Sequence, residues 1–71
     1  MTHPDPRTPT IDDELAAVEL VKDFGSWPAG TKGALIEAFP MEGTIEIVDD
    51  QGETLDMVIV PYKVLRISER R

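Results

Sequence analysis

The alternation of apolar and polar residues between positions 44 and 60 predicts a β-hairpin. Two segments, Thr44–Asp49 and Glu53–Val60, repeat with the period of two that is typical of strands with one buried face. The apolar set of the first segment is Ile45 and Ile47, and that of the second is Leu55, Met57 and Ile59. We therefore expect these two sets to share the inner face of the hairpin.

This expectation fixes a register. It sets Ile47 opposite Leu55 and Ile45 opposite Met57, and it leaves residues 50–52 as a three-residue loop. Such loops favour a left-handed final residue, which Gly52 supplies.

The same register predicts which residues form the outer face of the hairpin. Glu46 lies opposite Asp56, a like-charge pair that destabilises a sheet, and Val48, Val58 and Val60 share that face. Exposed aliphatic side chains flanked by carboxylates suit the binding of a basic protein partner. These five residues are the candidate partner-binding residues; the alternative is that a loop or the N-terminal arm covers the valines.

Further short segments complete the predicted fold. The apolar run 34–39 and the segment Val64–Ile67 are typical of strands, and Pro61 interrupts the chain before the latter. The intervening segment 23–33 is rich in glycine and proline and predicts a loop, with Gly30 and Gly33 as turn positions. Trp27 in this loop suits a lid on the core, and an exposed binding tryptophan is the alternative.

The N-terminal third is ambiguous. Thr10 and Asp13 resemble a capping box, and the apolar spacing over Asp12–Phe24 suits a helix, but the same residues also fit a strand with one buried face. Three prolines within residues 1–11 favour a disordered arm, which also carries His3.

Charge is unevenly distributed along the 71 residues. The net charge is −7, with 14 acidic and 7 basic residues, and residues 63–71 are the one basic segment. This balance disfavours binding to a phosphate backbone and favours a basic protein partner. The alternative is that the acidic residues only keep a small domain soluble. The lack of cysteine removes disulfides as a support and fits a cytoplasmic setting, and no segment is apolar enough to span a membrane.

Catalysis and metal binding find little support. The hydroxyls of Ser26 and Ser68 lack an ordered histidine to act as base, because His3 lies in the arm. The carboxylates of Asp49, Asp50 and Glu53 bracket the hairpin loop, but their spacing is not that of a calcium-binding loop. We expect no enzyme activity, no cofactor and no metal.

Four stretches together resemble a family of small bacterial proteins of unknown function. They are Glu14-Leu-x-x-Val-x-Leu-x-x-Asp23, Trp27-Pro-Ala-Gly30-x-x-Gly33, the strand ending Glu37-Ala-Phe39, and Ile45-Glu-Ile-Val-Asp-x-x-Gly52-x-Thr54. The chain departs from the family pattern at Ala34, where threonine is frequent, and at Gly43-Thr44, where a tyrosine opens the strand. The second departure argues against a site built on an aromatic side chain there.

The resemblance implies an all-β fold, a small SH3-like antiparallel barrel of about five strands. It makes at least Ala17–Lys22 the first strand and Pro61–Lys63 a short helical turn before the last one. The expected organisation is a disordered arm over 1–11, the barrel over 12–68 and a frayed basic tail over 69–71.

The resemblance also implies an accessory role, as the antitoxin or immunity-like half of a bacterial two-gene pair. Two alternatives stay open. One is an RNA-contacting module that uses the basic side chains Lys32, Lys63, Arg66, Arg70 and Arg71. The other is a small subunit that self-associates, as a homodimer, through the valine face or an edge strand.

Overall fold

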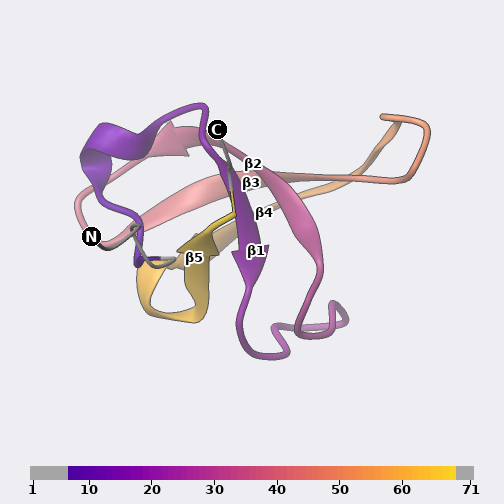
Figure 1. The fold of residues 1–71 in the computed structure, drawn as a ribbon, viewed down its shortest axis with the longest axis horizontal. Coiled ribbons are helices and arrows are strands. Elements are labelled where there is room, and N and C mark those ends of the chain that lie inside the picture. Colours follow the sequence, from indigo (N-terminus) through magenta and orange to yellow (C-terminus); the bar gives the residue numbers. More distant parts are fainter. Residues whose placement is uncertain (1–6, 69–71) are drawn as a thin grey trace, which may run out of the picture.

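The computed structural model describes residues 7–68 and confirms an all-β chain. Five strands form one antiparallel sheet: β1 (Ala17–Leu20), β2 (Lys32–Ala38), β3 (Glu42–Val48), β4 (Thr54–Pro61) and β5 (Leu65–Ile67). Two 3₁₀ turns, η1 (Ile11–Asp13) and η2 (Tyr62–Val64), precede β1 and β5. The strand order is β4-β3-β2-β1-β5, so β4 and β5 are the edges of the sheet (Figure 1).

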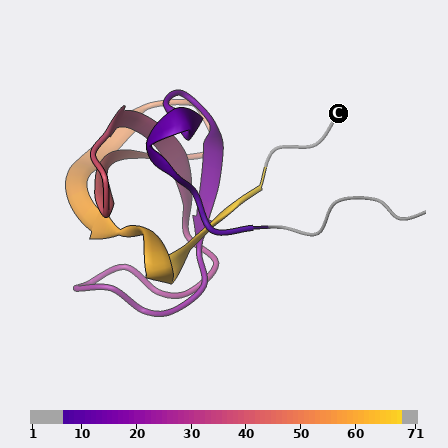
Figure 2. The same cartoon turned by 90° about the vertical axis from the view of Figure 1, so that its left-hand side faces the viewer.

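The sheet curls around its own inner face, as the end-on view in Figure 2 shows. The β3–β4 hairpin is the longest element and projects from one end of the molecule (Figure 1). Neither of the two short helical turns in residues 7–68 has the length or apolar character needed to cross a bilayer.

The ambiguous N-terminal segment forms both predicted structures, first a short helical turn and then a strand. The capping box is confirmed: the Thr10 hydroxyl accepts a hydrogen bond from the N–H of Asp12, and the Asp13 carboxylate accepts one of 2.8 Å from the N–H of Thr10. The helical turn ends at Asp13, because Glu14 takes an extended ψ of 136° and Leu15 then takes a left-handed φ of 76°, neither of which a helix can continue. The first strand then begins at Ala17, as the resemblance implied, and ends at Leu20, two residues earlier than expected.

Residues 7–11 lie against the fold. The carbonyl oxygen of Arg7 accepts a 2.8 Å hydrogen bond from the N–H of Ile67, and Pro9 is buried. The predicted arm therefore contacts the sheet from Arg7 onward. The rest of that arm, with His3, and the predicted tail over 69–71 lie outside the described residues.

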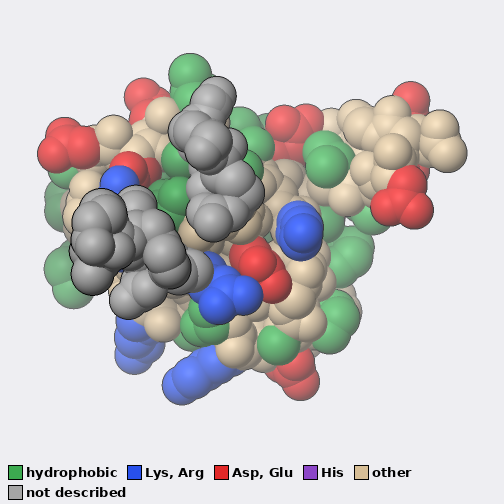
Figure 3. All heavy atoms as spheres, in the orientation of Figure 1, with side chains coloured by type: hydrophobic (Ala, Val, Ile, Leu, Met, Phe, Trp, Pro, Cys, Tyr) green, Lys and Arg blue, Asp and Glu red, His purple; other side chains and the backbone are tan. Residues whose placement is uncertain are grey.

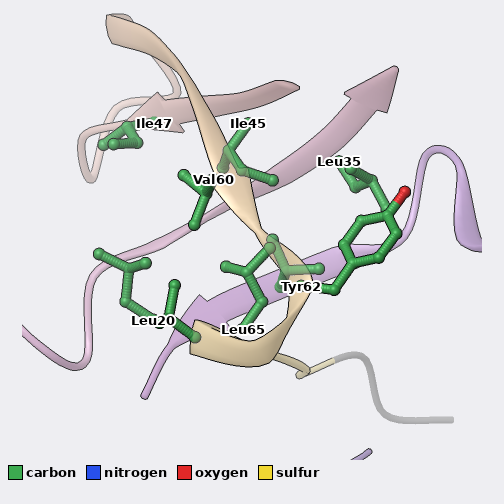
Figure 4. Packing of buried hydrophobic residues seen from close by; sticks show 9 residues of the cluster. Leu20, Leu35, Ile45, Ile47, Val60, Tyr62 and Leu65 are labelled. Carbon is green, nitrogen blue, oxygen red and sulfur yellow. The ribbon is translucent and has the colours of Figure 1, made fainter. Parts of the chain in front are cut away.

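The core lies inside the curl of the sheet. Its buried side chains come from all five strands and η2: Val18, Leu20, Leu35, Ile45, Ile47, Val60, Tyr62, Val64 and Leu65. In Figure 4 Val60 lies among Ile45, Leu20 and Leu65. The short helical turn before the last strand is confirmed, and Tyr62 and Val64 within it supply core side chains.

The prediction that Gly33 is a turn residue is wrong. Gly33 lies within β2, opposite Ile47 of β3 and Val18 of β1. A Cβ atom there would lie 2.5 Å from the backbone oxygen of Glu46, so the close approach of β3 requires glycine. Gly30, by contrast, is a turn residue with a φ of 93°.

The loop between β1 and β2 closes one side of the core. Phe24 and Trp27 face each other through two backbone hydrogen bonds of 2.7 and 2.9 Å, and both rings pack against the buried cluster. Trp27 is half-buried, which confirms its predicted role as a lid on the core.

Candidate functional site

The tip of the β3–β4 hairpin is built as the sequence predicts. Asp49 Oδ1 accepts hydrogen bonds of 2.8 and 2.9 Å from the N–H groups of Gln51 and Glu53. Gly52 has a φ of 83°, and its N–H donates to the carbonyl oxygen of Asp49. The carboxylate of Asp49 therefore holds the turn, and beside the turn Val48 lies opposite Thr54, as in the predicted register.

Beyond this pair the predicted register is wrong. Ile47 lies opposite Asp56, and the shift continues, with Ile45 opposite Val58. One extra residue, Leu55, stands in β4 between the two registers and forms a β-bulge. Because side chains alternate between faces, a shift of one residue exchanges the two faces of β4 from this point onward.

The consequence is a reversal of which aliphatic residues face water. Val60 is 1% exposed and Val58 is half-buried against the core, so their assignment to the outer face is wrong. The residues predicted to be inside are outside: Leu55, Met57 and Ile59 are 53%, 54% and 54% exposed. We call these three residues the β4 outer row. Residues 57–60 are all apolar, so one of the two alternating sets had to face out, and the sequence does not show which.

The predicted pair of Glu46 and Asp56 is also absent from the hairpin register: Asp56 lies opposite the buried Ile47, so its assignment to the outer face beside Glu46 is wrong. Glu46 lies opposite Met57, and its carboxylate accepts a hydrogen bond from the Thr54 hydroxyl. Asp56 Oδ2 accepts a 3.1 Å bond from the indole N–H of Trp27, and its Oδ1 accepts a 2.8 Å bond from the N–H of Met57. The like-charge contact predicted from the sequence is therefore avoided by the same bulge.

The outer face of the hairpin carries an acidic row beside an apolar one. Glu42 lies opposite Pro61 and Glu46 opposite Met57, so each carboxylate of β3 neighbours an apolar side chain of β4. Val48, which the sequence placed on this face, is there and is exposed. We call Glu42 and Glu46 the β3 acidic row.

The whole hairpin is acidic. Residues 42–61 contain six acidic side chains and no basic one: Glu42, Glu46, Asp49, Asp50, Glu53 and Asp56. Figure 3 shows acidic side chains where the hairpin projects, whereas Lys and Arg side chains gather elsewhere on the face in view. This hairpin therefore presents both the strongest charge and exposed aliphatic side chains.

A groove continues the apolar surface past the end of β4. Its volume is about 590 Å³, and its lining is Thr8, Pro9, Pro40, Met41, Glu42, Pro61, Tyr62 and Lys63. Met41 is strongly exposed at this groove. Pro61 belongs both to β4 and to the lining of the groove, so the groove begins where the edge strand ends.

The Tyr62 hydroxyl is buried at this end of the core. It has no hydrogen-bond partner among the described residues, and burial raises its pKa. In Figure 4 the ring lies beside Leu35 and the hydroxyl points away from Val60. A tyrosine hydroxyl with a raised pKa stays protonated at neutral pH.

The hollow inside the core is small. A hollow beneath Phe24 and Trp27 has a volume of about 10 Å³, which is room for about one water molecule. Among residues 7–68 no three acidic or histidine side chains gather as metal ligands would. Asp49, which the sequence analysis considered as a possible metal ligand, instead accepts hydrogen bonds from the backbone of the hairpin turn.

The basic side chains lie on other elements. Lys22, Lys32 and Lys63 are exposed, and Arg66 of β5 pairs with Glu19 of β1 at 3.3 Å. Arg70 and Arg71, which the RNA-binding alternative also requires, lie outside the described residues.

Comparisons of the chain with protein-family models, with curated proteins and with solved structures gave no match.

Proposed function

We propose that the chain is a non-catalytic, acidic protein-binding module, the antitoxin or immunity-like half of a bacterial two-gene pair, and that it binds a basic surface of its partner in the cytoplasm. The observation that carries the proposal is the outer face of the β3–β4 hairpin. There the exposed β4 outer row stands beside the β3 acidic row, in a hairpin of six carboxylates without a base.

The apolar and the acidic side chains of this face contribute differently to binding. Exposed aliphatic side chains supply the apolar centre of an interface, since burying them gains about 25 cal/mol per Å². Carboxylates beside them reject acidic partners and accelerate association with basic ones. The SH3-like barrel implied by the family resemblance agrees with the five-stranded antiparallel sheet and remains part of this proposal.

Co-expression with the product of the adjacent gene tests the proposal. The expected result is a stoichiometric complex that survives purification at low salt and weakens as salt rises, because the attraction between charges is screened. Replacement of Glu46 by Gln should weaken the complex, whereas the matched change Glu14→Gln, on the turn after η1, should not. A complex of unchanged affinity in Glu46→Gln and in high salt would overturn the proposal.

The RNA-contacting alternative receives less support. Its described side chains Lys32, Lys63 and Arg66 are few, and Arg66 already pairs with Glu19. Electrophoretic shift with single- and double-stranded RNA at about 50 mM salt, where electrostatic affinity is high, separates the two functions. We expect no shift.

A further inference from the structure

β4 is an edge of the sheet, and one side of its backbone has no partner strand among residues 7–68. The N–H of Tyr62 donates to the carbonyl oxygen of Met41, which fixes the residues whose backbone groups point to β3. Because this direction alternates in an antiparallel pair, the groups of Val58 and Val60 also point to β3. The N–H and C=O groups of Met57 and Ile59 therefore point to the open side.

This open side is short and unevenly protected. The bulge at Leu55 limits it at one end and Pro61, which lacks an N–H, limits it at the other. The N–H of Met57 is taken by the carboxylate of its neighbour Asp56 at 2.8 Å. In the described part of the chain, no side chain forms a hydrogen bond with the backbone of Ile59. The N–H and C=O groups of Ile59 are therefore the ones most available to an added strand.

The side chains along this edge determine which kind of strand can pair with β4. A second copy of the chain would bring two hairpins of six carboxylates together, so like charges oppose pairing of β4 with itself. A strand added to β4 would lie about 10 Å from β3, two strand spacings away. Lys or Arg stems on that strand would cover Met57 and Ile59, and their charged heads would reach the β3 acidic row.

We infer that the free edge of β4 is a docking strand, to which a short extended segment of a partner adds as a further strand, with apolar residues alternating with Lys or Arg. This inference rests on the proposed function and specifies how the basic partner is held. Backbone hydrogen bonds to Ile59 supply the pairing. The β4 outer row and the β3 acidic row favour Lys or Arg on the outer face, and the half-buried Val58 favours the alternating apolar residues on the inner face. From Leu55 to Pro61 the strand is about 20 Å long, enough for a segment of about six residues.

The test uses the full chain and three synthetic probes. The first is a capped eight-residue peptide in which lysine and valine alternate. The other two have the same sequence but are N-methylated on one or the other alternate set of backbone amides, which leaves charge and side chains unchanged. Affinity is measured by calorimetry, and the amide exchange of Ile59 is followed by NMR.

The inference predicts that the unmodified peptide binds and slows the amide exchange of Ile59 at least tenfold, and that one of the two methylated peptides binds at least tenfold more weakly. Met57→Lys should abolish binding of the unmodified peptide. The matched change Ile11→Lys, at a residue that is 51% exposed in η1, should preserve it.

Two other results are distinguishable. Equal affinity for all three peptides with unchanged exchange at Ile59 would overturn the docking strand and leave the basic-partner function standing. No binding of any peptide at millimolar concentration, together with no complex in the co-expression experiment, would overturn both.

Discussion

The indole N–H of Trp27 donates a 3.1 Å hydrogen bond to Oδ2 of Asp56, and this bond ties the loop after β1 to the edge strand β4. The other oxygen of the same carboxylate accepts a bond from the N–H of Met57. Asp56 therefore joins the lid of the core to the strand that carries the candidate binding row. Through this contact the loop helps to hold β4 in the register that exposes Met57.

Trp27→Phe keeps an aromatic lid and removes the donor. We expect Trp27→Phe and Asp56→Ala each to lower the free energy of unfolding, with a coupling between them of about 1 kcal/mol, the usual size for one hydrogen bond. Urea unfolding of both single variants and of the double variant measures this coupling. Strict additivity of the two changes would show that the bond contributes nothing to stability.

The reversed faces of β4 make opposite predictions for two neighbouring residues. Val60→Ala should lower the free energy of unfolding by about 2 kcal/mol, because it leaves a cavity in the core. Ile59→Ala should cost less than about 1 kcal/mol, since Ile59 is about half exposed and loses mainly strand propensity. Chemical denaturation of the two variants decides the register: the opposite order of stabilities would restore the register expected from parity alone.

Two glycines test different physical requirements. Gly33→Ala should cost about 1–3 kcal/mol, because the new Cβ atom would meet the backbone oxygen of Glu46 at 2.5 Å. Gly25→Asn should change stability by less than about 0.5 kcal/mol, since Gly25 has open space around it and asparagine tolerates its positive φ. Thermal melts of both variants check this, and equal destabilisation would contradict the close approach of β2 and β3.

Turn chemistry and capping were predictable because they depend on a few neighbouring residues. Gly52 and the Thr10–Asp13 capping box are both where the sequence places them. The register of β4 was not predictable, because residues 57–60 are apolar at every position and alternation cannot choose between the two faces. The bulge at Leu55 determines which set of β4 side chains faces the core, and no residue type in the sequence predicts a bulge at that position. The candidate site therefore moved from the valines to the β4 outer row, while its location on the hairpin stayed the same.

The ionised carboxylate of Asp13 should make the free energy of unfolding depend on pH in the acid range. The hydrogen bonds from the Arg7 guanidinium, at 2.7 and 2.8 Å, are the main reason why the pKa of Asp13 falls from 3.8 to about 2. A carboxylate with a lowered pKa in the folded state stabilises above its unfolded pKa, and that contribution is lost as the pH falls through the folded value. The window is therefore about pH 4 down to about pH 2.

The measurement compares the wild-type chain with Asp13→Asn by urea unfolding at about pH 5 and at about pH 2. The wild type should be the more stable at the higher pH, and the difference should shrink at the lower one. Because Arg7 is exposed, added salt should also reduce the difference at the higher pH. A difference that grows as the pH falls would contradict the ion pair.

The claim that the outer face of β4 binds a basic partner is tested most directly by the affinity of the chain for the product of the adjacent gene. Calorimetric titration should compare the wild type with Ile59→Lys and with the matched surface change Ile11→Lys. We predict that Ile59→Lys weakens binding at least about a hundredfold, through a lost apolar contact and an added like charge, whereas Ile11→Lys changes it by less than about threefold. Equal affinities for Ile59→Lys and the wild type would contradict the account.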